Sequence, residues 1–158
     1  MTTAVELLEF SRFEPAAVIG RMTELAGSLG GWINLQPNVD PNDVPGSGLR
    51  LLSIFSARGP AVPLVTWMPG QATRRGATPA EVGIQHPAGS RAVPLLRERG
   101  IDVPAGWTVV QDHPKRGLVL RPTDDAAVGD VLEWLLRAAP ALCPYELPTS
   151  WLAMVHTR

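Results

Sequence analysis

The scarcity of cysteine, of long apolar runs and of net charge excludes several classes of protein. It has one cysteine, Cys143, among 158 residues, which excludes both a disulfide framework and a cysteine-based zinc site. No apolar run approaches the roughly 18 residues that a membrane-spanning helix needs. Charged residues make up 18% of the chain and the net charge is −1. Because no overall positive field is present, we expect neither a nucleic-acid partner nor a membrane partner.

Targeting signals and catalytic motifs are also missing. The first ten residues have no basic start and contain Glu6 and Glu9, so they do not form a signal peptide, and a cytoplasmic location is expected. The sequence contains no phosphate-binding glycine loop, no Gly-x-Ser-x-Gly nucleophile motif and no His-Glu-x-x-His zinc motif. Cys143 has no base beside it in the sequence, which favours a small buried side chain over a nucleophile. We therefore assign no catalytic residue, no metal ligand and no cofactor.

The residues that are present predict one folded domain over residues 1–158. Apolar residues form 45% of the chain, and a chain of this length buries roughly 70% of its unfolded surface. Fifteen glycines and 16 prolines fall in clusters that separate short elements.

Apolar spacings of three and four predict three helices. These helices begin near Pro15, near Ser90 and after a cap at Asp124 or Asp125. In the third helix, Glu133 and Arg137 have the spacing of an ion pair. Strands are predicted at residues 32–35, 49–55, 62–68, 82–85, 107–113, 118–121 and 151–155.

The order of these elements favours an α+β fold. Residues 107–113 and 118–121 form a predicted hairpin, joined by a four-residue loop that ends in glycine. Residues 4–13 are ambiguous between helix and strand, and residues 69–80 are predicted to be a long loop. Because the helices do not alternate strictly with the strands, we predict a mostly antiparallel sheet with about three helices packed on it.

His113 and Asp112 are adjacent in the predicted hairpin. An imidazole and a carboxylate together can perform acid–base chemistry or bind a metal. Successive side chains in a strand leave opposite faces of the sheet, however, so the two do not form a dyad. We expect His113 to lie opposite Leu118 at the turn and Asp112 to be attracted to Arg121.

The best candidate for a ligand-binding group formed by residues close in sequence consists of His86, Ser90 and Arg91. A strand ends at His86 and a helix begins soon after, and free N–H groups at a helix start attract anions. The simpler interpretation is that Ser90 caps the helix and no ligand is needed. If the two strands are neighbours, His113 would join this group in one polar pocket. His156 is expected to fray because it lies near the chain end.

Two classes of function remain open. The leading hypothesis is a non-catalytic binding or protein-interaction module, with a protein or a small anion as partner and with homo-oligomers allowed. Exposed apolar surface would then mark the partner site. The alternative is a small hydrolase-like or metal-assisted enzyme that uses His86 and His113.

Part of the sequence resembles a known group of proteins. Gly106–Val119, with the sequence GWTVVQDHPKRGLV, is similar to a segment of small uncharacterised actinobacterial proteins, as are Gly83–His86 and Trp134–Ala139. The likeness covers mainly the second half of the chain. It implies a bacterial cytoplasmic protein and implies no activity.

Overall fold

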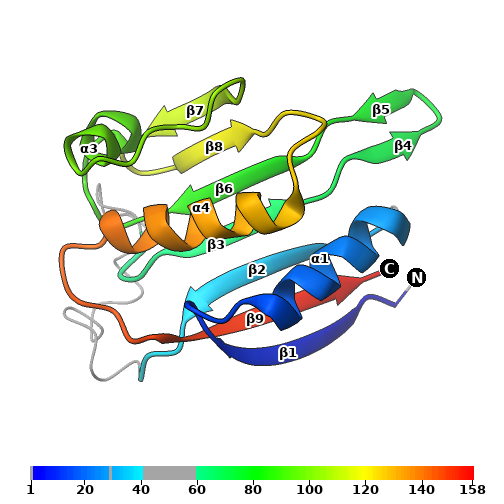
Figure 1. The fold of residues 1–158 in the computed structure, drawn as a ribbon, viewed down its shortest axis with the longest axis horizontal. Coiled ribbons are helices and arrows are strands. Elements are labelled where there is room, and N and C mark those ends of the chain that lie inside the picture. The colour runs from blue at the N-terminus through cyan, green and yellow to red at the C-terminus, as the bar shows by residue number, and fades with distance from the viewer. Residues whose placement is uncertain (1, 29, 41–59) are drawn as a thin grey trace.

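A computed structural model describes residues 2–28, 30–40 and 60–158. In these ranges the centre of the molecule is a seven-stranded sheet with the order β1-β9-β2-β3-β6-β8-β7, in which every neighbouring pair is antiparallel (Figure 1). Its strands are β1 (Ala4–Ser11), β2 (Trp32–Pro37), β3 (Leu64–Met68), β6 (Glu81–Gln85), β7 (Thr108–His113), β8 (Gly117–Arg121) and β9 (Ser150–Thr157). A separate hairpin consists of β4 (Gln71–Thr73) and β5 (Gly76–Thr78).

Three helices complete the described part of the chain: α1 (Ala16–Ser28), α3 (Ala92–Glu98) and α4 (Val128–Ala141). Figure 1 shows α1 and α4 lying across the same face of the sheet, with α3 beside the β7 end. This arrangement confirms the predicted α+β fold with its antiparallel sheet. None of these helices is long and apolar enough to cross a membrane.

The core forms where the alternating apolar residues of the strands meet the apolar stripes of the helices. Along β9, Trp151, Ala153 and Val155 are buried while the residues between them are only half-buried. The same two-residue alternation in β2 buries Ile33 and Leu35. One hydrophobic cluster joins these strands to α1 and α4. The described residues therefore share a single core.

The structure resolves one ambiguous segment and corrects one prediction. Residues 4–13 contain a strand, β1, which pairs with β9 along its whole length. The predicted loop at residues 69–80 is wrong, because this segment forms the β4–β5 hairpin. Its strands are short and exposed, so no buried apolar alternation marks them in the sequence. The strand predicted at 49–55 lies outside the described residues.

The predicted caps of two helices are also wrong. Helix α4 begins after Ala127, and no side chain caps it, so neither Asp124 nor Asp125 has that role. Helix α3 begins after Arg91 without a hydrogen bond from a local side chain. The expected Glu133–Arg137 ion pair does not form within α4.

The last strand lies inside the sheet, between β1 and β2. Gly31 permits the close approach of β2 to β9 at this point. Its φ is +106°, and a Cβ atom here would lie 2.1 Å from the carbonyl oxygen of His156. Only glycine avoids both the backbone strain and the collision.

We predict that Gly31→Ala destabilises the protein far more than Gly76→Ala. Both glycines have positive φ, but a Cβ atom added at Gly76 would meet nothing within 4 Å. Gly76→Ala should cost only the left-handed backbone strain of about 1–2 kcal/mol. Gly31→Ala should exceed about 4 kcal/mol because backbone atoms must move. Urea denaturation of both variants measures the difference, and equal midpoints would contradict the prediction.

Candidate functional site

The start of α3 is held by a carboxylate from a distant strand. Asp112 on β7 accepts hydrogen bonds from the backbone N–H groups of Ala92, at 2.6 Å, and Val93, at 2.9 Å. Its side chain is only 3% exposed, and the guanidinium Nε of Arg91 lies 4.0 Å from it. Asp112 therefore satisfies the free donors at the helix start, and exposed Ser90 does not cap the helix.

The expected attraction between Asp112 and Arg121 is wrong. Arg121 instead pairs with Glu81 on β6, where its Nε lies 3.3 Å from Oε2. A bulge in β7 between Val109 and Gln111 changes the register of the hairpin. Asp112 therefore lies opposite Leu118, and its side chain reaches α3.

His86 lies in the same buried region as Asp112. The imidazole is 1% exposed, and its Nδ1 accepts a hydrogen bond of 3.3 Å from the N–H of Ala88. Its Nε2 has no partner among the described residues. Burial lowers the pKa of His86, and the negative charge of Asp112 opposes this change. The side chain is therefore a neutral imidazole with no surface for a substrate to contact.

His113 belongs to a turn. Its Nδ1 accepts hydrogen bonds from the N–H groups of Lys115, at 3.0 Å, and Arg116, at 3.1 Å. It pairs with Gly117 and does not lie opposite Leu118 as expected. Because Asp112 faces α3, the next side chain along the strand faces the other side of the sheet.

The structure thus gathers some of the predicted site residues and separates others. His86 and Arg91 come together around Asp112, while His113 lies in its own turn and Ser90 is exposed. Within the described ranges, no group of three His, Cys, Asp or Glu side chains is arranged to hold a metal. Ligand binding by His86, Ser90, Arg91 and His113 stays a prediction.

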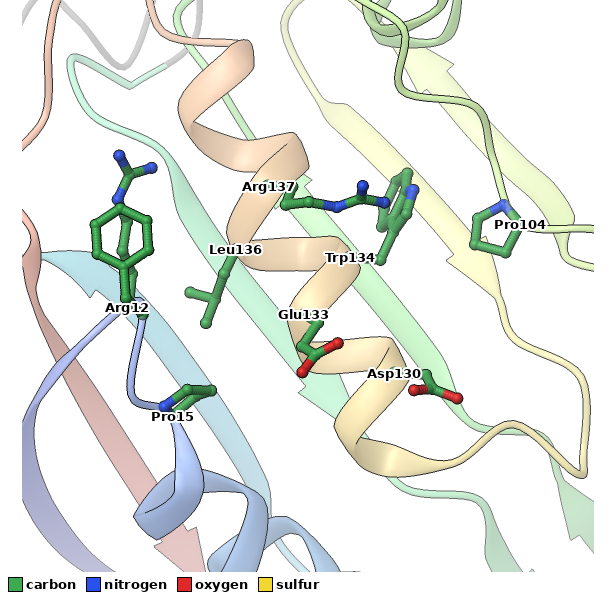
Figure 2. A pocket seen from close by; sticks show the side chains of 9 residues that line it. Arg12, Pro15, Pro104, Asp130, Glu133, Trp134, Leu136 and Arg137 are labelled. Carbon is green, nitrogen blue, oxygen red and sulfur yellow. The ribbon is translucent and has the colours of Figure 1, made fainter.

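A groove of about 550 Å³ lies along α4 and faces the turn between β1 and α1 (Figure 2). We call it the α4 groove. Its apolar lining comes from Phe13, Pro15, Pro104, Trp134 and Leu136. The Trp134 indole N–H donates a hydrogen bond of 2.9 Å to the carbonyl of Asp102, which fixes the ring in place.

The charged residues of the α4 groove are segregated along its length. Figure 2 shows the carboxylates of Asp130 and Glu133 nearer the start of α4, whereas Arg137 lies farther along the helix with its guanidinium toward Trp134, and Arg12 lies across α4 from it. The Arg12 guanidinium lies 4.7 Å from the centre of the Phe13 ring, whose residue is 69% exposed. In the described part of the chain, neither arginine has a carboxylate within ion-pair distance. The groove therefore offers two available cations beside an apolar surface.

The face of the sheet opposite the helices carries a second group that the sequence did not reveal. The rings of Trp32 and His156 stack with centroids 4.4 Å apart. Asn34 Nδ2 lies 3.2 Å from His156 Nε2, and the Thr66 hydroxyl donates to Asn34 Oδ1 at 2.9 Å. The expected fraying of His156 is wrong, because β9 is paired on both sides. The apolar alternation of β9 marks this strand in the sequence, and the strand extends two residues beyond the predicted end at residue 155.

Cys143 is buried and free of disulfide bonds. Burial raises the pKa of its thiol, and burial also raises the pKa of Tyr145 to about 12, with a further contribution from Cys143. A thiol with a raised pKa has little thiolate near neutral pH and is a poor nucleophile. This geometry agrees with the packing role expected for Cys143.

We predict that Asp112→Asn destabilises the protein by about 1–3 kcal/mol. The amide retains one oxygen, so one of the two buried N–H groups at the start of α3 loses its acceptor, and the negative charge is lost. Asp102→Asn is the matched control, since Asp102 is exposed and pairs weakly with Arg97 at 3.8 Å. Equal shifts of the urea midpoint in both variants would show that Asp112 is not a structural cap.

His86 should make the protein less stable in mild acid. Its pKa is lowered by folding, so below the unfolded value of 6.5 the unfolded chain binds more protons and stability falls. The slope has a limit of about 1.4 kcal/mol per pH unit. His86→Asn keeps an acceptor for the Ala88 N–H but does not titrate, so its unfolding free energy should fall less between about pH 7 and pH 5. His113→Asn is the control, and a wild-type slope in His86→Asn would contradict this assignment.

Comparisons with known proteins leave the function to be inferred from geometry. No protein-family model matches the chain, and neither a curated protein nor a solved structure matches it. Only chemistry and geometry therefore distinguish the three candidate regions, which are the α4 groove, the buried Asp112 region and the Trp32–His156 group.

Proposed function

We propose that this protein is a non-catalytic binding module that holds a small apolar carboxylate in the α4 groove. The observation that carries the proposal is the placement of Arg12 and Arg137 beside an apolar surface, with no carboxylate pairing either one in the described residues. An anionic ligand would supply the missing partner. The sequence also predicted a small anion as a possible partner, but at His86, Ser90, Arg91 and His113 and not in this groove.

The chemistry of the groove fits such a ligand. Guanidinium groups bind carboxylates through charge-assisted hydrogen bonds that are stronger than neutral ones. The apolar part of the ligand would pack mainly against the exposed Phe13 ring, because Trp134 and Leu136 are buried and present only a small part of their surface to the groove. A volume of about 550 Å³ lies within the range typical of small-molecule sites.

The acidic end of the groove would set the orientation of the ligand. Asp130 and Glu133 repel a carboxylate, so the anionic group is directed away from them, toward one of the two arginines. The same acidic pair disfavours ligands that carry a negative charge at both ends. The expected class is therefore a monocarboxylate with an apolar body.

Binding is better supported than catalysis by the two histidines. His86 is buried with its Nδ1 bonded to the Ala88 N–H, and His113 uses its Nδ1 within its own turn, which does not favour joint catalysis by the two imidazoles. An enzyme that combines them would need both side chains to move. The cytoplasmic location and the bacterial setting stay predictions.

Calorimetric titration with octanoate and octanol tests the proposal. Wild-type protein should bind octanoate, and octanol should bind more weakly because it lacks the charge. Arg137→Gln should weaken octanoate binding by about 10- to 100-fold, since hydrogen bonds to charged groups contribute about 1.5–3 kcal/mol. The same variant should leave octanol binding unchanged.

Arg116→Gln is the matched control, because Arg116 is exposed in the β7–β8 turn and does not line the α4 groove. Octanoate affinity should stay at the wild-type value in this variant. The proposal is wrong if octanoate does not bind, or if it binds equally well to the Arg12→Gln, Arg137→Gln double variant.

A further inference from the structure

We propose that the free edge of β1 is a self-association site, at which a second copy of this chain adds its own β1 in antiparallel orientation. The two sheets would then form one continuous sheet across a two-fold axis. Figure 1 shows β1 as an outer strand, with no described strand or helix beyond it. This inference is independent of the α4 groove.

The edge of β1 has no backbone device that would prevent pairing. All eight residues pair with β9 in an unbroken register from Ala4 to Ser11. The strand contains no proline, no glycine and no bulge. Natural proteins usually protect an edge strand with one of these features or with outward charges. Within the described chain, none of the backbone features blocks a further strand at β1.

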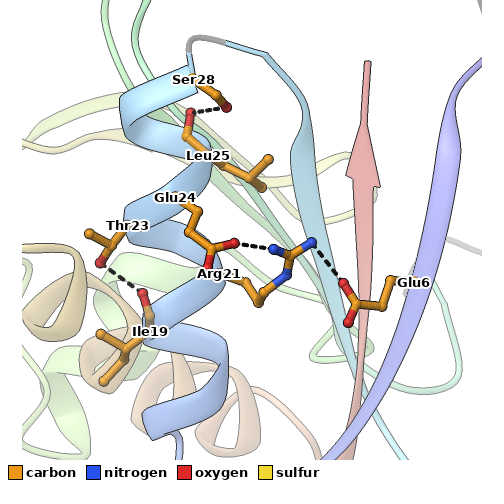
Figure 3. A network of polar contacts seen from close by, with 7 residues as sticks. All are labelled: Glu6, Ile19, Arg21, Thr23, Glu24, Leu25 and Ser28. Atoms are coloured by element: carbon orange, nitrogen blue, oxygen red, sulfur yellow. Dashed lines mark hydrogen bonds and ion pairs between the residues drawn. The ribbon is translucent and has the colours of Figure 1, made fainter.

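The two charges on β1 are held by the chain itself. The Glu6 carboxylate lies 2.7 Å from the Arg21 guanidinium on α1, which also pairs with Glu24 (Figure 3). Glu9 accepts a hydrogen bond of 3.0 Å from the Ser150 hydroxyl on the neighbouring strand. Both residues remain exposed, but each carboxylate has a partner within its own chain, which weakens its effect on a strand that pairs at the free edge.

Two apolar side chains of β1 are exposed beside its free edge. Leu7 is 67% exposed and Val5 is 56% exposed, and both lie on the face of the sheet that α1 does not cover. Adding a strand beside β1 would cover part of both side chains. The hydrophobic gain would add to the new backbone hydrogen bonds.

The other edge of the sheet favours β1–β1 pairing over a head-to-tail arrangement. β7 contains a bulge between Val109 and Gln111, which disrupts the regular spacing of its backbone groups. A β1 strand from a second copy would not find a regular partner there. Pairing of the same edge in both copies closes a dimer and leaves no unpaired β1.

The sequence of β1 favours a register centred on Leu7 over one centred on Glu6. A two-fold axis perpendicular to the sheet places side chains of the same face opposite each other. With the axis at Leu7, this residue lies opposite Leu7 of the other copy, and Val5 lies opposite Glu9. Placing the axis at Glu6 would bring together two carboxylates, each already paired with Arg21, which is less favourable than an apolar Leu7 pair.

Charge substitutions at Leu7 test both the interface and its register. Sedimentation equilibrium across the micromolar range should show wild-type dimers. Leu7→Lys and Leu7→Glu should each weaken the dimer at least tenfold, because like charges would lie opposite each other at the axis. A 1:1 mixture of the two variants should restore a dimer, now held by opposite charges. Circular dichroism checks that each variant is folded, which is expected because Leu7 is exposed.

Val110→Lys is the control, since Val110 is an exposed residue of the β7 edge. It should leave the dimer intact. A monomeric wild-type protein would overturn the proposal, as would a Leu7→Lys variant that dimerises normally. Failure of the Lys and Glu variants to associate with each other would overturn it as well, and so would loss of the dimer in Val110→Lys.

Discussion

Two helices cover one face of the sheet, and the remaining features depend on this one-sided burial. Helix α4 places Val131, Leu135 and Ala138 against the strands, and α1 adds the buried residues Val18 and Met22. Because no described helix covers the opposite face, its side chains must satisfy one another. The stacked rings and the amide network described on that face meet this requirement without a second layer.

Burial under the helices also determines which polar side chains can contact a ligand. Asp112 lies under the helical layer, where its two oxygens satisfy the first donors of α3. His86 is buried beside it and remains neutral. A charge or imidazole in such a position is held by the fold, because moving it would leave buried donors without acceptors. Side chains that are free to bind a ligand are therefore found in the α4 groove, where Arg12 and Arg137 lie beside apolar residues.

Local signals were readable in the sequence, whereas contacts between distant segments were not. The stripe of α4 and the hairpin around residues 114–117 follow from spacing and turn residues, and both formed. The cap of α3 could not be predicted, because Asp112 lies 20 residues away from Ala92. The α4 groove likewise combines Arg12 with α4, which are joined only by tertiary packing. The ordered position of His156 could not be predicted either, because its partners, Trp32 and Asn34, precede it by most of the chain.

The central place of β9 has a consequence for synthesis on the ribosome. β1 emerges before every other described strand, yet its neighbour in the sheet is β9, the last strand of the described chain. At ordinary elongation rates the nascent chain carries β1 without this neighbour for on the order of ten seconds. During that interval an apolar segment with two open edges is exposed to chaperones and to other nascent chains. The greatest hazard of misassembly therefore falls before the sheet is complete.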